Sequence, residues 1–463
     1  MSKKQLFTVT DLGGGDGGKG GIVHKLCVEH DAHTVLKVGG AQGSHGVRTA
    51  NGQRFNFSQF GCGTFDGVKT HITNLMVIEP QRLMNEARQL REEWRISDIY
   101  DYLTVDEDCL CVTPFHTIAS RIHELARKDK PKGTIGVGVG EAVLDAELHP
   151  ELAIRAKDLG KPGLYEKLEA VRLQKLNELR PIIESPDNFW SADHDLARKE
   201  IEYLTNPRFA DWSAGEFTRM TKEVRIVDTG YLEEEILSEE GTVVVESSHG
   251  ILTDRYHGFH PHVSRTRTLP QATFDLLKER GYDGEVIPLG VTRAYQIRHG
   301  AGPMVTESSE MLERLLPGSN KDENRWQGKV RVGPLDLVAL RYSIAVCGGP
   351  EVFKGLAVSW FDQIAKNGRW DVCDAYEGAT DNNYFSPTGE ILVRCGTDQK
   401  QVEHQEELGR QLNHCRPVIT SYDLKGMGED EVVDLCSRVL EEKLRVKVRM
   451  ISLGSTEEDK RCL

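Results

Sequence analysis

Eight residues near the N-terminus, Gly13-Gly14-Gly15-Asp16-Gly17-Gly18-Lys19-Gly20, constrain the fold of this chain more than any other segment. The residues before them, Leu6–Thr10, predict a buried strand, and Ile22–Cys27 predict the opening of a helix. A strand, a glycine turn and a helix N-terminus point backbone N–H groups and a positive dipole end at one spot, which suits a polyphosphate. The alternative is a flexible glycine turn with solvated Asp and Lys side chains.

The loop departs from a standard phosphate-binding loop at one position. The spacing from Gly13 to Lys19 matches G-x-x-x-x-G-K, but Gly20 stands where a Ser or Thr hydroxyl would bind magnesium. We therefore expect Asp16, which lies inside the loop, to contact the metal.

Short apolar runs alternate with helical segments along most of the chain. This alternation predicts an α/β fold with a large, mostly parallel central sheet flanked by helices, like that of P-loop NTPases. Residues 141–240 are charged and helical, so we expect a helical insertion within a single domain spanning residues 1–463. The predicted strands after the first are Thr34–Val38, Ile72–Ile78, Leu103–Val105, Gly241–Glu246, Glu285–Val291, Gly355–Phe361, Glu390–Val393, Pro417–Ser421 and Val446–Ser452.

The amino-acid composition argues against several classes of function. A formal net charge of −14 argues against a protein that binds nucleic acid through phosphate contacts. No apolar run approaches the length of a membrane span and the N-terminus does not resemble a signal peptide, so we expect a cytoplasmic protein with no membrane partner. The ten cysteines lack disulfide or zinc spacing, which predicts reduced and mostly buried thiols.

Four further motifs follow the glycine loop in a fixed order. They are Gly39-Gly40-Ala41-Gln42-Gly43-Ser44-His45, Gly133-Thr134-Ile135-Gly136-Val137-Gly138, Glu246-Ser247-Ser248-His249-Gly250 and the run Arg293–Glu307. In this order they resemble the adenylosuccinate synthetase family, from Phe7 to about Gly454. The resemblance implies a ligase of purine biosynthesis that joins L-aspartate to carbon 6 of IMP, driven by GTP, through a 6-phosphoryl intermediate.

The resemblance also implies roles for individual residues. Asp16 matches the catalytic base that removes the purine N1 proton, and His45 matches the acid that stabilises charge on O6 and on the transferred phosphoryl group. Mg²⁺ is the implied cofactor, with Asp16 and the Gly43 carbonyl among its ligands. A homodimer is implied as well.

Three substrate pockets are implied on the same basis. Lys329 and Arg331 match cations that bind the aspartate carboxylates. In the monophosphate pocket, Val137 occupies the place of a family arginine. In the triphosphate pocket, Trp360 replaces a lysine that covers the guanine base, and because an indole can stack on any purine, ATP is conceivable in place of GTP. The triphosphate set is Gly15, Gly17, Gly18, Lys19, Gly20, Trp360, Asp362, Ser452 and Gly454, and the monophosphate set is Gln42, Thr134, His249, Arg265 and His299.

Two other functions remain open from the sequence. Ser264-Arg265, Thr292-Arg293 and Lys329-Val330-Arg331 look closer to the phage relative 2-aminoadenylosuccinate synthase, which takes dGMP with ATP or dATP, although that relative has Ser in place of the loop Asp. The substituted monophosphate pocket also allows a nucleotide-binding regulator that has lost ligation. For His257, His260 and His262 we favour a pocket-wall loop over a zinc site.

Overall fold

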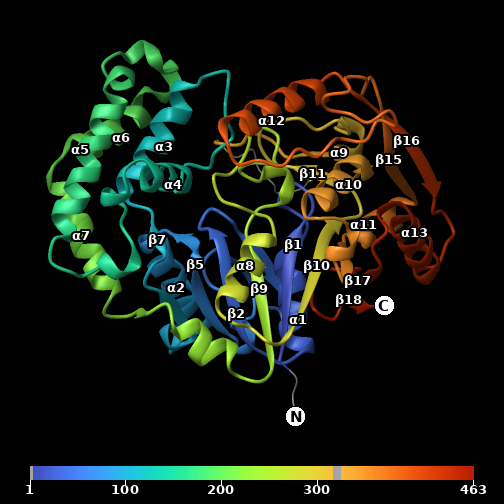
Figure 1. Ribbon diagram of the computed structural model, residues 1–463, viewed down its shortest axis with the longest axis horizontal. Coiled ribbons are helices and arrows are strands. Elements are labelled where there is room, and N and C mark those ends of the chain that lie inside the picture. The colour runs from blue at the N-terminus through green and yellow to red at the C-terminus, as the bar shows by residue number, and fades with distance from the viewer. Residues whose placement is uncertain (1–3, 316–324) are drawn as a thin grey trace.

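The computed structural model describes residues 4–315 and 325–463 (Figure 1). Within these residues, eleven strands form one central sheet. All its pairs are parallel except β17 with β18, and the short strand β7 (Leu110–Cys111) pairs with β5 beside the main path. In spatial order the path runs β18 (Lys460–Cys462), β17 (Val448–Ser452), β14 (Gly355–Ser359), β10 (Glu285–Arg293), β1 (Gln5–Asp11), β9 (Thr242–Ser247), β2 (Ala32–Gly40), β5 (Lys69–Ile78), β6 (Leu103–Asp106) and β8 (Arg225–Val227). The α/β class with a large parallel sheet is thereby confirmed.

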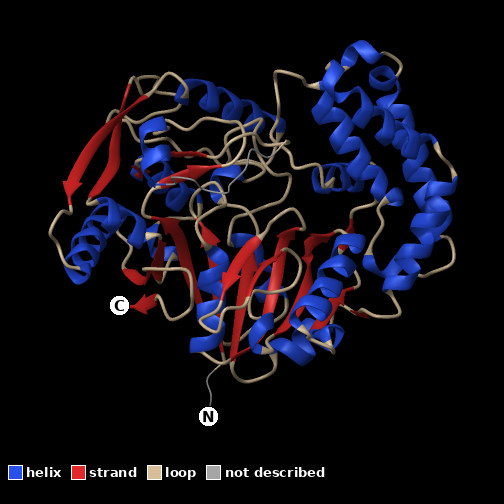
Figure 2. Cartoon of the chain, turned by 180° about the vertical axis from the view of Figure 1, so that it is seen from behind, coloured by secondary structure: helices blue, strands red, loops and turns tan. Residues whose placement is uncertain are grey.

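Helices cover both faces of the sheet, as the two opposite views show (Figures 1 and 2). On one face, Phe7 and Val9 of β1 pack with apolar side chains of α1 (Lys19–Glu29) and α2 (Pro80–Trp94). On the other, Leu6 packs with α8 (Gln271–Glu279) and the π-helix Leu232–Leu237. Strands buried on both faces read as continuous apolar runs, which is why the sequence pattern located them.

Five helices form a lobe at one side of the sheet (Figure 1). They are α3 (Pro114–Ala126), α4 (Val139–Leu148), α5 (Leu164–Ile183), α6 (His194–Thr205) and α7 (Arg208–Met220). Thr113 is the N-cap of α3, and its hydroxyl accepts from the His116 N–H. Pro114 is the first residue of the helix, a position that favours proline. The stretch 141–240 therefore holds most of this lobe, and it also contains β8 at the edge of the sheet.

The other side carries smaller elements around the end of the sheet. Helices α10 (Leu337–Val346), α11 (Phe361–Asn367) and α13 (Glu429–Leu444) pack with β14 and β17 in a second apolar cluster. The remaining elements are β3 (His45–Arg48), β4 (Arg54–Phe57), β11 (Gln296–Arg298), α9 (Ser309–Leu315), β12 (Arg331–Gly333), β13 (Leu335–Asp336), β15 (Arg369–Glu377), α12 (Gln399–Leu412) and β16 (Arg416–Asp423).

Two of the predicted strands differ from the structure. Residues 390–393 form no strand: Ile391 makes only an isolated bridge to Phe385, because the segment closes a short turn instead of crossing a sheet. Residues 417–421 do lie in a strand, β16, but it pairs antiparallel with β15 in a separate three-stranded sheet. Most of β16 is exposed, so its apolar residues do not mark the central core.

The structure also describes the state of the cysteines and the character of the helices. All ten cysteines are free thiols, and eight of them are buried. Across residues 4–315 and 325–463, the structure contains no helix with the length and apolar character needed to span a bilayer.

Candidate active site

The site lies where four neighbouring parallel strands end. Strand β10 ends at Arg293, and its neighbour β1 leads into the glycine loop. The next strand, β9, leads into the segment Ser247–Gly250, and β2 leads into the turn before His45. Parallel strands bring their carboxyl ends to one edge of the sheet, which is the usual place for a ligand in such folds. Motifs separated by more than two hundred residues in sequence therefore meet here.

A cavity of about 620 Å³ opens at this edge, a size suited to a nucleotide. Its wall includes nine of the residues expected from the sequence: Gly15, Asp16, Gln42, Gly43, His45, Thr134, His249, Arg265 and His299. The expected residues outside its wall are Gly17, Gly18, Lys19, Gly20, Lys329, Arg331, Trp360, Asp362, Ser452 and Gly454. The monophosphate set and the two catalytic candidates thus share one cavity.

Asp11, which sequence reasoning missed, organises the glycine loop from within. Its carboxylate accepts from the N–H groups of Gly13 at 2.8 Å and Gly17 at 2.7 Å, and from the Lys19 ammonium at 2.9 Å. Lys19 also donates to the Gly15 carbonyl at 2.8 Å, and its side chain is fully buried. Lys19 thus holds the glycine loop together from within.

Close packing explains why the loop has glycine at position 20. A Cβ atom on Gly20 would lie 2.7 Å from the Gly46 carbonyl oxygen and 3.0 Å from the His45 Cβ. Helix α1 therefore approaches β3 so closely that the hydroxyl-bearing residue of a standard phosphate loop does not fit. This contact holds the start of α1 against His45.

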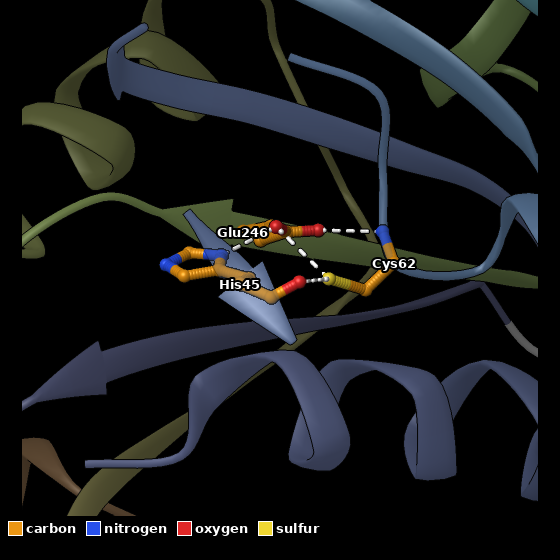
Figure 3. Close-up of side chains that lie close together, drawn as sticks. All are labelled: His45, Cys62 and Glu246. Atoms are coloured by element: carbon orange, nitrogen blue, oxygen red, sulfur yellow. Dashed lines mark hydrogen bonds and ion pairs between the residues drawn. The ribbon is translucent and has the colours of Figure 1, made fainter. Parts of the chain in front are cut away.

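The His45 imidazole is fixed by a buried carboxylate (Figure 3). His45 Nδ1 lies 2.6 Å from Glu246 Oε1, which also accepts from the Lys37 ammonium at 2.6 Å, while the Cys62 N–H donates to Glu246 Oε2 at 2.9 Å. An ionised Glu246 places the imidazole proton on Nδ1, so that Nε2 is the nitrogen left for a ligand.

The charges of this cluster follow from burial and pairing. Burial opposes ionisation of Glu246, but Lys37 and His45 outweigh it and lower the Glu246 pKa far below its usual value. Burial lowers the His45 pKa, and the attraction of Glu246 does not fully offset this effect. His45 is therefore neutral at pH 7 until negative charge arrives beside it.

Asp16 projects into the same cavity with about a third of its side chain exposed. Its Oδ2 lies 3.3 Å from His299 Nε2. Nearby, the partly buried His249 has a left-handed backbone conformation with φ of 66°, and its Nδ1, which is itself buried, has no hydrogen-bond partner among the described residues. Burial, followed by the charges of Lys19 and His45, lowers the His249 pKa to about 3. His249 is therefore a neutral ring that can bind a ligand through an otherwise unsatisfied nitrogen.

The expected triphosphate residues gather beside the loop at the ends of β14 and β17. The Arg293 guanidinium lies 4.4 Å from the Trp360 ring centroid and donates to the Asp16 carbonyl oxygen, which ties the indole to the glycine loop. Ser359 donates to the Gly17 carbonyl at 2.7 Å, so β14 also contacts the loop directly. Ser452 donates to the Gly454 carbonyl at 2.8 Å in the turn after β17.

Asp362 is partly engaged within its own helix. Its Oδ2 accepts from Lys366 at 3.0 Å and from Gln363 at 2.8 Å. The carboxylate side chain is mostly buried, with 16% of its area exposed.

The expected aspartate-binding cations lie at the start of β12, which pairs with β11, and just before it. Arg331 donates to the carbonyl oxygens of Gly300 at 2.7 Å and Gly302 at 2.9 Å and pairs with Glu307, so it fixes the turn after His299. Lys329 is exposed on the connection before β12. Arg298, which we did not single out, is buried in the cavity wall, and burial and Arg331 lower its pKa to about 10.

The donors in the cavity fit a hard cation such as Mg²⁺. Asp16 offers a partly exposed carboxylate, and Gly43 lies in the same wall with its backbone carbonyl. The cluster of His45, Cys62 and Glu246 could geometrically hold an ion, but its carboxylate oxygens already accept from Lys37, His45 and Cys62.

Two histidines of the 257–262 segment bond to backbone carbonyl oxygens. His260 contacts the Arg255 carbonyl, and His262 contacts the Lys132 carbonyl.

Three residues whose roles the sequence did not predict carried a visible signal. Lys37 and Glu246 interrupt otherwise apolar buried strands, and a charge inside such a run needs a buried partner. Asp11 likewise ends an apolar strand. Lys132 gave no such signal, because its position depends on a loop, whereas Arg298 ends β11 within the run Arg293–Glu307.

Comparison with known proteins gives one family. The family model described as adenylosuccinate synthetase matches residues 9–460. The chain is 30% identical to adenylosuccinate synthetase of Chlorobium chlorochromatii over 365 residues, which cover 78% of this chain and 77% of that one. It is 29% identical to adenylosuccinate synthetase of Chlorobium phaeobacteroides over 450 residues, which cover 96% and 94%.

Two solved structures have a similar fold. Fully ligated adenylosuccinate synthetase from Plasmodium falciparum matches with a TM-score of 0.76 at 18% identity, covering 99% of each chain. The succinoaminodeoxyadenylate synthetase of cyanophage S-2L, bound to dGMP and dATP, matches with a TM-score of 0.57 at 13% identity, covering 99% of this chain and 95% of that one.

Proposed function

Because the chain belongs to the adenylosuccinate synthetase family, a family of C–N ligases of purine biosynthesis, we propose that it joins L-aspartate to carbon 6 of IMP with hydrolysis of GTP. The observation that carries this proposal is the cavity shared by Asp16 and His45, in which Glu246 fixes the imidazole. A base and a charge-stabilising group facing one nucleotide-sized space are what the reaction requires.

In the proposed reaction, Asp16 removes one proton and His45 stabilises the transfer of one phosphoryl group. Asp16 takes the proton from purine N1, which makes O6 nucleophilic enough to attack the γ-phosphorus and release the nucleoside diphosphate. His45 Nε2 stabilises the negative charge that builds up on O6 and on the phosphoryl oxygens, since that charge raises its pKa and favours the imidazolium. The aspartate amine then attacks carbon 6, and inorganic phosphate leaves with O6.

Mg²⁺ is the proposed cofactor, held by Asp16 and the Gly43 carbonyl. When bound, it neutralises phosphate charge and orients the γ-phosphoryl group. We further propose Lys329 and Arg331 as the aspartate-binding cations, and Trp360, Asp362, Ser452 and Gly454 as the groups around the triphosphate base and ribose.

We also propose a cytoplasmic homodimer that acts on small molecules. Ten free thiols, eight of them buried, support a reducing compartment. Sedimentation analysis tests the assembly, with a single monomeric species counting against it.

The activity is tested by a substrate panel. The protein is incubated with Mg²⁺ and aspartate, with IMP, dIMP, GMP or dGMP as acceptor and GTP, ATP or dATP as donor, and succinyl-purine formation is followed by absorbance. We expect turnover with IMP and GTP. Preference for dGMP with ATP or dATP would instead assign the phage-type activity, and tight nucleotide binding without product from any pair would assign a regulator.

Substitution of the proposed base gives the sharper test. Asp16→Asn should lower kcat by about 10²–10⁴-fold, because removal of a positioned base commonly has this effect. Affinity for the triphosphate should be spared in part, because asparagine keeps one oxygen that can bind Mg²⁺ and the contact of Arg293 with the backbone of residue 16 is unchanged. Asp211→Asn, at an exposed position on α7, is the matched control. Unchanged kcat in Asp16→Asn would remove this residue from the mechanism.

A further inference from the structure

Two cations in the cavity wall take no part in the chemical steps described above, although the family resemblance places one of them, Arg265, among the monophosphate-binding residues. Lys132 lies in the connection between α3 and α4, and Arg265 lies in the loop before α8, and both line the cavity. Among residues 4–315 and 325–463, the Lys132 ammonium and the Arg265 guanidinium have neither a hydrogen-bond nor an ion-pair partner. Two unpaired cations that face one cavity favour an anionic ligand.

The surroundings of Lys132 show that these cations crowd one another. Burial, followed by the charges of Arg265 and Arg127, lowers the Lys132 pKa to about 8, and the carboxylates of Glu141 and Glu124 only partly offset this effect. Arg127 already pairs with Glu124 at 2.8 Å, and Glu141 with Lys175 and His123, so these carboxylates do not neutralise the pair. A bound dianion would relieve this repulsion.

The cavity wall carries two groups of charges. The largest charge effects on His249 come from Lys19, His45, Asp11 and Asp16, whereas those on Lys132 come from Arg265, Arg127, Glu141 and Glu124. We call the part of the wall that carries Lys132 and Arg265 the cationic end. Thr134 and Ser264 add hydroxyl groups to the same wall.

We propose that Lys132 and Arg265 bind the 5′-phosphate of the nucleotide monophosphate, within one chain, at the cationic end of the cavity. The proposal rests on the proposed function for the identity of the ligand. A phosphate monoester suits this pair, because a guanidinium fork and an ammonium point charge together satisfy a tetrahedral dianion. Val137 stands nearby where the family has an arginine, so these residues supply the charge that Val137 lacks.

Binding calorimetry tests the proposal without requiring turnover. IMP, dGMP, inosine and ribose 5-phosphate are titrated into the wild-type protein, Lys132→Met and Arg265→Met. We expect each substitution to weaken binding of the monophosphates and of ribose 5-phosphate by about 10–100-fold, with inosine unchanged, because only inosine lacks the phosphate. Lys130→Met, an exposed lysine two residues away, removes the same charge and should change affinity less than about twofold.

Proton uptake gives a second readout. At pH 8 the bound phosphate should raise the Lys132 pKa, so binding takes up a fraction of a proton, measured from calorimetry in buffers with different ionisation enthalpies. The titratable groups around Lys132 are Glu124, Arg127, Glu141, Arg265, His260 and His262. The uptake should be lost in Lys132→Met and retained in Lys130→Met.

The outcomes separate this inference from the proposed function. Equal loss of inosine and IMP affinity, loss of aspartate affinity alone, or unchanged binding in both variants would overturn the phosphate assignment. Lysine-dependent binding of ribose 5-phosphate in a protein that forms no succinyl-purine would uphold the inference and reject the ligase. Binding of none of the four probes to the wild-type protein would overturn the assignment as well.

Discussion

Glu246 fixes His45 and Lys37 through the same carboxylate oxygen, at 2.6 Å from each. All three side chains are almost fully buried, so the carboxylate is not replaceable by water. A buried charge that loses its partner is strongly destabilising, and an imidazole that loses its partner is free to change tautomer and orientation. The proposed role of His45 therefore depends on a residue that touches no reacting atom.

Glu246→Gln should lower kcat by about 10²-fold with less effect on the KM for IMP, because His45 loses the charge that orients it. The glutamine also lacks the negative charge that raises the His45 pKa. The fall of kcat at high pH, where His45 loses its proton, should therefore occur at lower pH than in the wild-type protein. Steady-state kinetics between pH 5.5 and 9 measure both effects.

A second variant separates positioning from folding. Glu246→Gln alone leaves the Lys37 ammonium buried without an anion, so its melting temperature should fall. Adding Lys37→Met should restore much of the melting temperature but not kcat. Full recovery of kcat in the double variant would show that Glu246 acts only through stability.

At the scale of elements, the cationic end of the cavity depends on how α4 starts against α3. Gly138, the N-cap of α4, has φ of 97°, and a Cβ there would lie 2.6 Å from the His116 carbonyl carbon and the Thr117 nitrogen. These are backbone atoms of α3 and cannot move aside as a side chain would. The connection that carries Lys132 and Thr134 runs between these two helices, so its path is set by their contact.

Gly138→Ala should therefore destabilise the protein by several kcal/mol and weaken binding of IMP, since α4 must move away from α3. Gly163→Ala is the matched control, because Gly163 is the N-cap of α5 with φ of 90° and no atom within 4 Å of its Cβ position. That control carries only the left-handed backbone strain, about 1 kcal/mol. Urea unfolding and calorimetry compare the two. Equal losses in both variants would show that α3–α4 packing is unimportant.

At the scale of the whole molecule, the helical lobe and one half of the sheet share a continuous apolar core. Val9 and Val244 of the sheet belong to the same buried cluster as Leu168 of α5 and Phe217 of α7. We therefore propose that the chain is one domain with a helical insertion, and that the lobe does not unfold separately. A lobe with its own core would instead behave as an independent unit.

Hydrogen exchange in increasing urea tests this proposal. Amides of α5 and of β9 should share the same opening free energy and the same denaturant dependence, because their exposure requires loss of the common core. Exchange of α5 at a lower free energy, with β9 still protected, would make the lobe a separate folding unit.

The sequence by itself determined the features that depend on local patterns. Leu6–Thr10, Gly13–Gly20 and Ile22–Cys27 gave a strand, a turn and a helix, because burial on both faces and glycine torsions are written into neighbouring residues. The motifs containing Asp16, Gln42, His45 and His249 also follow strands whose carboxyl ends meet at one edge.

Only the tertiary structure decided which charges meet. Lys19 turns inward to Asp11, Glu246 joins His45 across about two hundred residues of sequence, and Lys132 and Arg265 line the same cavity. Residues 390–393, three of them apolar, form no strand, since their pairing is limited to an isolated bridge between Ile391 and Phe385. The physical reason is that burial of apolar side chains follows from local periodicity, whereas the pairing of charges depends on distances between loops that only the packed molecule fixes.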